Sequence, residues 1–370
     1  MNRRPSRSLP LSSQHSCRYR TTSADTFYPT AQRKRRRFSF YFAVLLSVLA
    51  VLLLFNTAIN RFVFVRHVGI PVAHLPASID GVTLLQISDL KGAEFGTGQK
   101  GIASHLKGKR VDAVVLTGDM VSPQGNAEPF YDLLDSLREV LPEVPIWFIS
   151  GDGDPEPVSV KYWAEGSCFA SWVLGAVRHG ARLLQAPVRL NQEGPGIWLI
   201  PGSDLSLDLS LEQERFHQLQ YDALASGDEI LNELARFHLA GLSGFETAQK
   251  EIKPEDLCVA LLHAEDPGIT EQFFEAAGSE IYGIDAVLSG HWLGGLIHIP
   301  CVGPLFIPSV NLPNSGLLPG NGYDGLSRKG SIWHYVSSGL GSRDQKYPSF
   351  FFRLANPPSV SLIQFYSSGV

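Results

Sequence analysis

Five short apolar runs along the sequence are each followed closely by a side chain that can bind a metal ion. The runs cover residues 84–87, 111–116, 144–149, 258–262 and 284–288, and the side chains that follow them are Asp89, Asp119, Asp152, His263 and His291. Apolar runs of this length are typical of buried strands, and open α/β sheets bind ligands beyond the carboxyl ends of their strands. Carboxylates combined with imidazoles suit Mn, Fe or Zn better than Ca. The sequence therefore predicts a metal site at the strand ends.

Each of these residues, taken singly, also has a purely structural interpretation. An Asp after a strand is commonly a turn former or a helix cap, and a single His is commonly a hydrogen-bonded structural residue. The shared position after apolar runs favours a common site, as do the glycines directly before Asp119 and His291.

The elements around these residues suggest an α/β sandwich. Residues 97–107 and 127–141 suit helices between the first three apolar runs, and the resulting strand, helix, strand, helix, strand order begins such a fold. Farther along, we expect helical segments at 162–179 and 212–237, strands at 182–190, 196–200, 332–337 and 360–365, and long loops over 299–330. The segment 212–237, interrupted near Gly227, could form a lid or an insertion.

The N-terminal part of the chain predicts a membrane anchor. Residues 38–59 are 22 consecutive uncharged residues rich in Leu, Val, Phe and Ala. At about 1.5 Å per residue, a helix of this length spans the roughly 30 Å hydrocarbon core. The basic run 33–37 precedes it, so the positive-inside rule places the N-terminus in the cytosol and the remainder outside. A cleaved signal peptide is the alternative.

These features divide the chain into four expected parts on a single-pass protein of the cell membrane. They are a basic, disordered cytosolic tail (1–37), a transmembrane helix (38–59), a juxtamembrane connector (60–78) and an extracytoplasmic globular domain (79–370). Pro71 and Pro76 argue against one continuous helix through the connector.

Charge is unevenly distributed over these parts. The formal net charge is −5, but residues 1–37 contain ten basic residues and one acidic residue, which leaves a net charge of −14 on the remainder. Affinity for nucleic acid comes largely from Lys and Arg at phosphates, so we expect no nucleic-acid partner. The basic run 33–37 suits an orientation signal in contact with anionic lipid of the bilayer.

The order of motifs resembles that of the calcineurin-like metallophosphoesterase superfamily, and within it the bacterial membrane-anchored branch. The resemblance covers residues 79–366 and rests on Asp89-Leu90-Lys91, Gly118-Asp119, Gly151-Asp152-Gly153-Asp154, Leu261-Leu262-His263 and Gly290-His291-Trp292-Leu293-Gly294-Gly295. It implies a four-layer α/β/β/α sandwich and metal-dependent hydrolysis of a phosphoester.

The chain departs from the family pattern at positions that carry chemistry. Lys91 and Leu293 occupy positions where the family has histidines that bind one of two metals. The resemblance implies that the other metal keeps its ligands, and Asp152 replaces an Asn among them. Those ligands are Asp119, Asp152, His263 and His291. We therefore expect one divalent ion per chain.

The remaining side chains of the altered site have an expected electrostatic role. Lys91 would act as a fixed cation in place of the lost metal, beside Asp89, which the family uses as a metal ligand. Gly153 stands where the family has a His that assists the leaving group. His179, His298 and His334 are other imidazoles, for which core or surface roles are expected.

Two functions follow from this comparison. The first is hydrolysis of a membrane-associated or cell-envelope phosphoester at a single-metal site. The second is an inactive pseudo-phosphoesterase that binds a metal, a ligand or a protein partner.

Overall fold

The computed structural model describes residues 28–122, 124–165, 167–202, 208–264, 283–295, 297–299, 302–307, 316–317, 322–342 and 353–368. The chain divides into two compact units, residues 1–55 and residues 56–370.

The first unit is dominated by one long helix. Helix α1 covers Tyr28–Ile59, and its segment Arg37–Ile59 is apolar, with exposed side chains from residue 37 to residue 55. This segment is long and apolar enough to cross a membrane, as expected for residues 38–59. Most of the tail expected at 1–37 lies outside the described residues, and its last part, from Tyr28, belongs to α1.

The second unit contains a first six-stranded sheet in the order β1-β15-β2-β3-β4-β5. The strands are β1 (Phe64–Val72), β2 (Thr83–Ile87), β3 (Ala113–Thr117), β4 (Ile146–Ile149), β5 (Ala181–Leu183) and β15 (Ser359–Ser367). Strands β2 to β5 are parallel, so the residues that follow them lie at one edge of the sheet. Strand β15 pairs antiparallel with β2 and parallel with β1.

A second six-stranded sheet has the order β13-β14-β9-β8-β7-β6. Its strands are β6 (Val188–Arg189), β7 (Ile197–Pro201), β8 (Leu257–Leu262), β9 (Ala286–Ser289), β13 (Gly325–Lys329) and β14 (Ile332–Val336). Strands β7, β8, β9 and β14 are parallel. A small third sheet contains β10 (Ile297–Ile299), β11 (Gly303–Ile307) and β12 (Gly316–Leu317).

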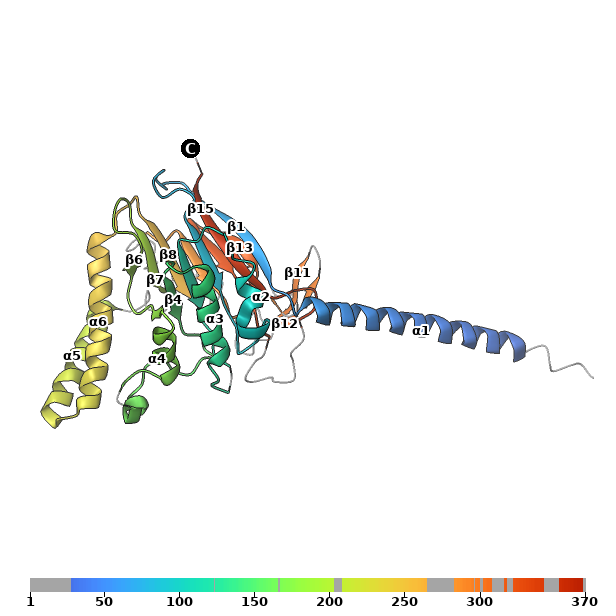
Figure 1. The fold of residues 1–370 in the computed structure, drawn as a ribbon, viewed down its shortest axis with the longest axis horizontal. Coiled ribbons are helices and arrows are strands. Elements are labelled where there is room, and N and C mark those ends of the chain that lie inside the picture. Colours follow the sequence, from blue (N-terminus) through green and yellow to red (C-terminus); the bar gives the residue numbers. More distant parts are fainter. Residues whose placement is uncertain are drawn as a thin grey trace, which may run out of the picture. The chain divides into compact units, whose positions relative to one another are not determined.

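Three apolar clusters hold the layers together. Leu84 and Val115 of the first sheet pack against Leu199 and Val259 of the second, so the two sheets lie face to face. Helices α2 (Lys100–Ala103), α3 (Glu128–Val140) and α4 (Ser171–Arg178) cover the outer face of the first sheet, where a second cluster forms. Helices α5 (Leu209–Ser226) and α6 (Glu229–Glu251) lie side by side, and α6 packs on the outer face of the second sheet (Figure 1). The expected four-layer α/β/β/α sandwich is therefore confirmed.

Helix α3 has the regular apolar spacing from which the sequence predicted a helix. Its apolar side chains Phe130, Leu133, Leu134 and Leu137 recur at helical spacing and are all buried against the first sheet. The opposite face carries charged residues, and the helix ends ahead of Pro142, which cannot continue it.

Several expected elements differ in the structure. The connector expected at 60–78 contains β1, so the sheet begins before residue 79. Strand β1 is an edge strand, where Pro71 costs no hydrogen bond inside the sheet. The single strand expected at 182–190 is two strands, β5 and β6, which belong to different sheets. Leu184, just after β5, is buried between those sheets, where the chain crosses from one to the other.

The remaining differences concern helices and loops. Residues 97–107 form a 3₁₀ turn (Thr97–Gln99) and the short α2, and the helix expected at 162–179 is a 3₁₀ turn (Val160–Glu165) followed by α4. The segment expected at 212–237 is two helices that extend to Glu251, with Gly227 in the left-handed conformation between them. The loops expected over 299–330 contain β11, β12 and β13.

Candidate metal centre

The five predicted side chains follow β2, β3, β4, β8 and β9, and strained turns position several of them. Five non-glycine residues of these turns have φ angles between 50° and 60°, namely Asp89, Lys91, Asp119, His291 and Leu293. A left-handed backbone is uncommon for residues with a side chain and persists where the surrounding structure enforces it. The turns therefore hold these side chains in directions that an ordinary strand end would not give.

Four of the five side chains converge on one point. Donor atoms of Asp119, Asp152, His263 and His291 all lie within 4.8 Å of one another. His263 Nε2 lies 3.2 Å from Asp119 Oδ1 and 3.0 Å from Asp152 Oδ1, and His291 Nδ1 lies 2.9 Å from the same Asp152 oxygen. Two carboxylates and two imidazoles at these separations could hold a divalent ion such as Mn, Fe or Zn.

The tautomer of His263 fits a metal ligand. His263 Nδ1 lies 2.7 Å from the carbonyl oxygen of Thr117, which accepts a hydrogen bond from the ring. The other ring nitrogen, Nε2, is buried and faces the oxygens of Asp119 and Asp152. A lone pair aimed at two carboxylates requires a cation between them, either a metal ion or a proton.

The pKa shifts of the clustered side chains agree with this geometry. Burial alone would lower the pKa of His263, but Asp119 and Asp152 outweigh burial and hold that pKa well above its ordinary value. Burial likewise opposes ionisation of Asp119 and Asp152, yet His263 and the neighbouring cations hold the pKa of both carboxyls below the ordinary range. Geometry and charge therefore both favour a cation between His263 Nε2 and the two carboxylates.

Asp154, to which the sequence assigned no role, holds the turns in place. Its carboxylate accepts backbone hydrogen bonds from Asp119 at 2.9 Å, Val121 at 2.8 Å and Gly151 at 2.8 Å. Burial raises its pKa to about 6, while the backbone donors favour the ionised form. Asp154 therefore ties the turn after β3 to the turn after β4, and its position within Gly-Asp-Gly-Asp was the available signal.

Lys91 lies between two buried carboxylates. Its Nζ is 2.8 Å from Asp119 Oδ2 and 3.4 Å from Asp89 Oδ1, and the Lys91 side chain is only 12% exposed. Burial would lower the pKa of Lys91, but Asp89 and Asp119 outweigh it and raise that pKa above its ordinary value. Asp89 Oδ2 also accepts a hydrogen bond from the backbone of His291 at 3.0 Å. The ammonium group is therefore a fixed positive charge at the side of the metal site.

An apolar side chain lies near the same carboxylate. A Cβ built on Gly339 would meet Leu293 Cδ2 at 2.8 Å and Asp89 Cβ at 2.9 Å, so both side chains border that glycine. Leu293 is buried and offers no donor atom. Asp89 is thus surrounded by Lys91, a backbone donor and an apolar group.

Position 153 carries no side chain beside the cluster. The backbone N–H of Gly153 donates to Asp119 Oδ1 at 2.7 Å, and an added Cβ would approach that carboxylate to about 3 Å. The other histidines considered from the sequence have partners elsewhere. His179 pairs with Asp135 at 2.7 Å beside α3, His298 lies 3.5 Å from Asp324, and His334 is buried in β14.

The fold and the convergent donors agree with the class of protein that the motifs indicated, the calcineurin-like phosphoesterase family. A model of the calcineurin-like phosphoesterase family matches residues 82–294, and the chain belongs to this family. The resemblance inferred from the motifs is thereby confirmed. Metal binding is a property of the family, and Asp119, Asp152, His263 and His291 form the candidate site in this chain.

Comparison with individual proteins adds little about activity. No curated protein sequence matches the chain significantly. Among solved structures, the chain is similar to the phosphopantetheinyl hydrolase of Mycobacterium tuberculosis, with 12% identity and a TM-score of 0.36. That match covers 77% of this chain and 96% of the other chain.

Proposed function

We propose that the chain is a phosphoesterase with one metal ion, held by Asp119, Asp152, His263 and His291. One observation carries the proposal: four donor atoms converge, while Lys91 Nζ bridges Asp89 and Asp119 beside them. When bound, a divalent ion would act as a Lewis acid toward a phosphoryl oxygen. Mn, Fe and Zn suit the donor set.

Lys91 and Asp89 have electrostatic roles in this proposal. Three carboxylates, Lys91 and one divalent ion together carry about zero net charge, whereas a second ion would leave the site positive. Lys91 keeps Asp119 oriented toward the metal and prevents repulsion between Asp119 and Asp89. The phosphoryl group would therefore meet less positive charge here than at a two-metal site.

The site lacks a side chain that protonates the leaving group at position 153. A positioned general acid typically contributes 10² to 10⁴ in rate. Turnover should therefore be slow with esters whose leaving groups need a proton, and faster with esters such as nitrophenyl phosphates. The same loss, together with Lys91 and Leu293, favours the second candidate function, an inactive pseudo-phosphoesterase that binds a metal, a ligand or a protein.

The experiment that separates the two functions uses the full chain in detergent with added Mn. We expect measurable hydrolysis of p-nitrophenyl phosphate or bis-p-nitrophenyl phosphate, and a loss of at least about 100-fold in Asp152→Ala. Asp135→Ala is the matched control, because its carboxylate is similarly exposed but pairs with His179 at the surface. Equal rates in the parent and Asp152→Ala would reject hydrolysis at this site and favour the second candidate function, the inactive pseudo-phosphoesterase.

We also propose that α1 anchors the chain in the cell membrane with residues 60–370 outside the cytosol. The apolar segment Arg37–Ile59 and the basic residues 33–37 before it support this orientation. The substrate would then be a phosphorylated envelope component or lipid, with the bilayer as partner. In intact spheroplasts, added protease should degrade the globular domain. Protection of that domain from protease would reverse the proposed orientation.

A further inference from the structure

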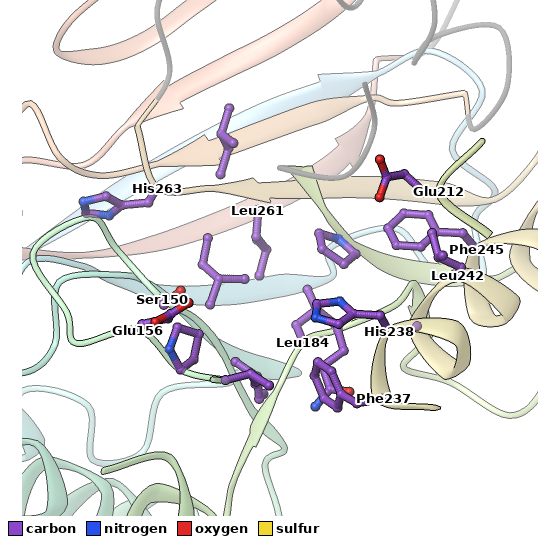
Figure 2. A pocket seen from close by; sticks show the side chains of 18 of the residues that line it. Ser150, Glu156, Leu184, Glu212, Phe237, His238, Leu242, Phe245, Leu261 and His263 are labelled. Carbon is purple, nitrogen blue, oxygen red and sulfur yellow. The ribbon is translucent and has the colours of Figure 1, made fainter. Parts of the chain in front are cut away.

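A cavity of about 560 Å³ opens beside the candidate metal centre, and Asp152 and His263 belong to its wall (Figure 2). The rest of the wall comes from the ends of β4, β7 and β8, from residues 156–158 and 183–185, and from α5 and α6. This volume lies in the range of about 300–1,000 Å³ that is usual for small-molecule sites. A ligand bound at the metal centre would therefore have space on one side for a substituent.

The cavity has a polar end beside the candidate metal centre and an opposite end of mainly apolar side chains. Figure 2 shows His263 at the first end and Phe237, His238, Leu242 and Phe245 at the other, where Glu212 also lies, with Leu184 and Leu261 between them. Phe245 and Leu261 are almost fully buried and belong to the lining of this cavity. A phosphoester bound at the metal end would direct its organic group toward the apolar end.

The described lining of the cavity offers no cation for a second anionic group. None of the described lining residues is Lys or Arg, and the lining carboxylates Glu156 and Glu212 are paired with Lys161 at 2.9 Å and Arg215 at 3.3 Å. Burial lowers the pKa of His238 below its ordinary value, so this imidazole is neutral at physiological pH. A nucleotide or a polyphosphate would find no cation in the described lining, and the nearby Arg215 and Lys161 are already paired with carboxylates. An alkyl or aryl group would instead replace water at apolar surface.

The helical wall is held firmly in place. Phe237 packs edge-to-face on Phe169 with ring centroids 5.2 Å apart, and His238 stacks on Phe216 at 4.3 Å. Gly244 lets α6 approach Ala186 so closely that an added Cβ would lie 2.5 Å from the Ala186 side chain. The apolar end is therefore a preformed pocket between α6 and residues 183–186.

We propose that this cavity binds the apolar organic group of the phosphoester substrate, and that α5 and α6 set the specificity for that group. The inference rests on the proposed function, because it places the phosphate at the metal centre. The substrate class is a phosphoester with an alkyl or aryl substituent, supplied either by a lipid of the bilayer or by a soluble ester.

The test measures binding without turnover. Full-length protein in lipid nanodiscs with Mn is titrated by calorimetry with methyl-, hexyl- and decylphosphonate, whose carbon–phosphorus bonds are not hydrolysed. Empty nanodiscs correct for partitioning into lipid. Since each buried methylene contributes about fourfold in affinity, hexylphosphonate should bind at least about 30-fold more tightly than methylphosphonate. Equal affinities for the three ligands would overturn the inference.

A filled cavity should remove this chain-length dependence. In Gly241→Leu, the new side chain starts in α6 at the cavity wall, where an added Cβ would only touch the Gln185 carbonyl oxygen at 3.4 Å. We expect methylphosphonate to bind as in the parent and hexylphosphonate to lose at least about tenfold in affinity. Ser243→Leu is the matched control, because residue 243 is exposed on the same helix. A chain-length dependence unchanged in Gly241→Leu would place the alkyl group elsewhere and overturn the inference.

The outcomes also distinguish this inference from the proposed function. Phosphonate binding that depends on chain length, without hydrolysis of any ester, would support the cavity and reject catalysis. Hydrolysis together with equal affinity for short and long phosphonates would support catalysis and reject the proposed role of the cavity. Phosphatidic acid in the nanodisc, added as a competitor of hexylphosphonate, identifies the source: displacement indicates a lipid ester, and no displacement indicates a soluble one.

Discussion

At the scale of single residues, Lys91 distinguishes this chain from the motif pattern of its family. Its ammonium contacts Asp119 at 2.8 Å and lies 3.4 Å from Asp89, whose side chain is fully buried. Removing one partner of a buried ionic cluster leaves charge without compensation and typically costs about 3–5 kcal/mol. The lysine is thus expected to contribute to stability as well as to the electrostatics of the metal site.

Replacement of this charge gives a direct prediction. Lys91→Met should lower the free energy of unfolding by about 3 kcal/mol, because Asp89 and Asp119 would remain buried beside each other without the ammonium. Urea unfolding of the purified chain measures the change. The double variant Lys91→Met/Asp89→Asn should recover part of the loss, since one of the two carboxylates is gone. A stability of Lys91→Met equal to that of the parent would show that the lysine does not compensate these charges.

The sequence predicted the residues of the candidate site but not all of the contacts that hold them in place. Asp89, Asp119, Asp152, His263 and His291 were found because each follows a short apolar run, and parallel strands bring such positions to one edge. The contribution of Asp154 was not found, because Gly-Asp-Gly-Asp indicates a polar turn but does not show which way each carboxylate faces. Only the fold shows that Asp154 turns inward to three backbone donors.

At the scale of elements, tight packing between turns fixes the geometry of the centre. The turn after β4 passes so close to Asp119 that a Cβ on Gly151 would lie 2.1 Å from its Oδ1. Asp154 joins the same turn to the one after β3 through backbone hydrogen bonds. The position of the candidate ligand Asp119 therefore depends on the turn after β4, through Gly151 and Asp154, which are not themselves candidate ligands.

Gly151→Ala tests this dependence. The added methyl group must displace the Asp119 carboxylate, so we expect the affinity for Mn to fall about 10-fold to 100-fold, as for other changes that misorient metal ligands. Calorimetric titration with Mn measures the affinity. Gly241→Ala adds the same methyl group in α6, where the surroundings are much less crowded than at Gly151. This variant should leave the affinity for Mn unchanged. Unaltered Mn affinity in Gly151→Ala would mean that Asp119 does not bind the ion.

Helices and strands could be predicted from the sequence where their apolar residues form one clear pattern. The buried strands β2, β3 and β8 are short apolar runs, and α3 has a clear helical stripe. Strand β1 was missed because its burial does not alternate regularly and Pro71 suggested a break. The segment 182–190 was read as one strand because local sequence does not show that β5 and β6 join different sheets.

At the scale of the whole molecule, both sheets of the second unit contribute to the site. The site residues follow the carboxyl ends of parallel strands in each sheet. The first sheet supplies Asp89, Lys91, Asp119 and Asp152, and the second supplies His263 and His291. Neither sheet holds a complete ligand set, so metal binding requires the assembled sandwich. The order of strands, which sequence alone could not give, decides which residues meet.

We propose that one metal ion binds per chain, with Lys91 in place of a second. The most direct measurement is the metal content of the purified full chain after loading with Mn and removal of the excess. We expect one ion per chain, because the described donors converge at one point and Leu293 and Lys91 offer no metal ligand beside Asp89. Asp152→Ala should retain less than one. Two ions per chain would contradict the role of Lys91, and no bound ion would contradict the metal centre itself.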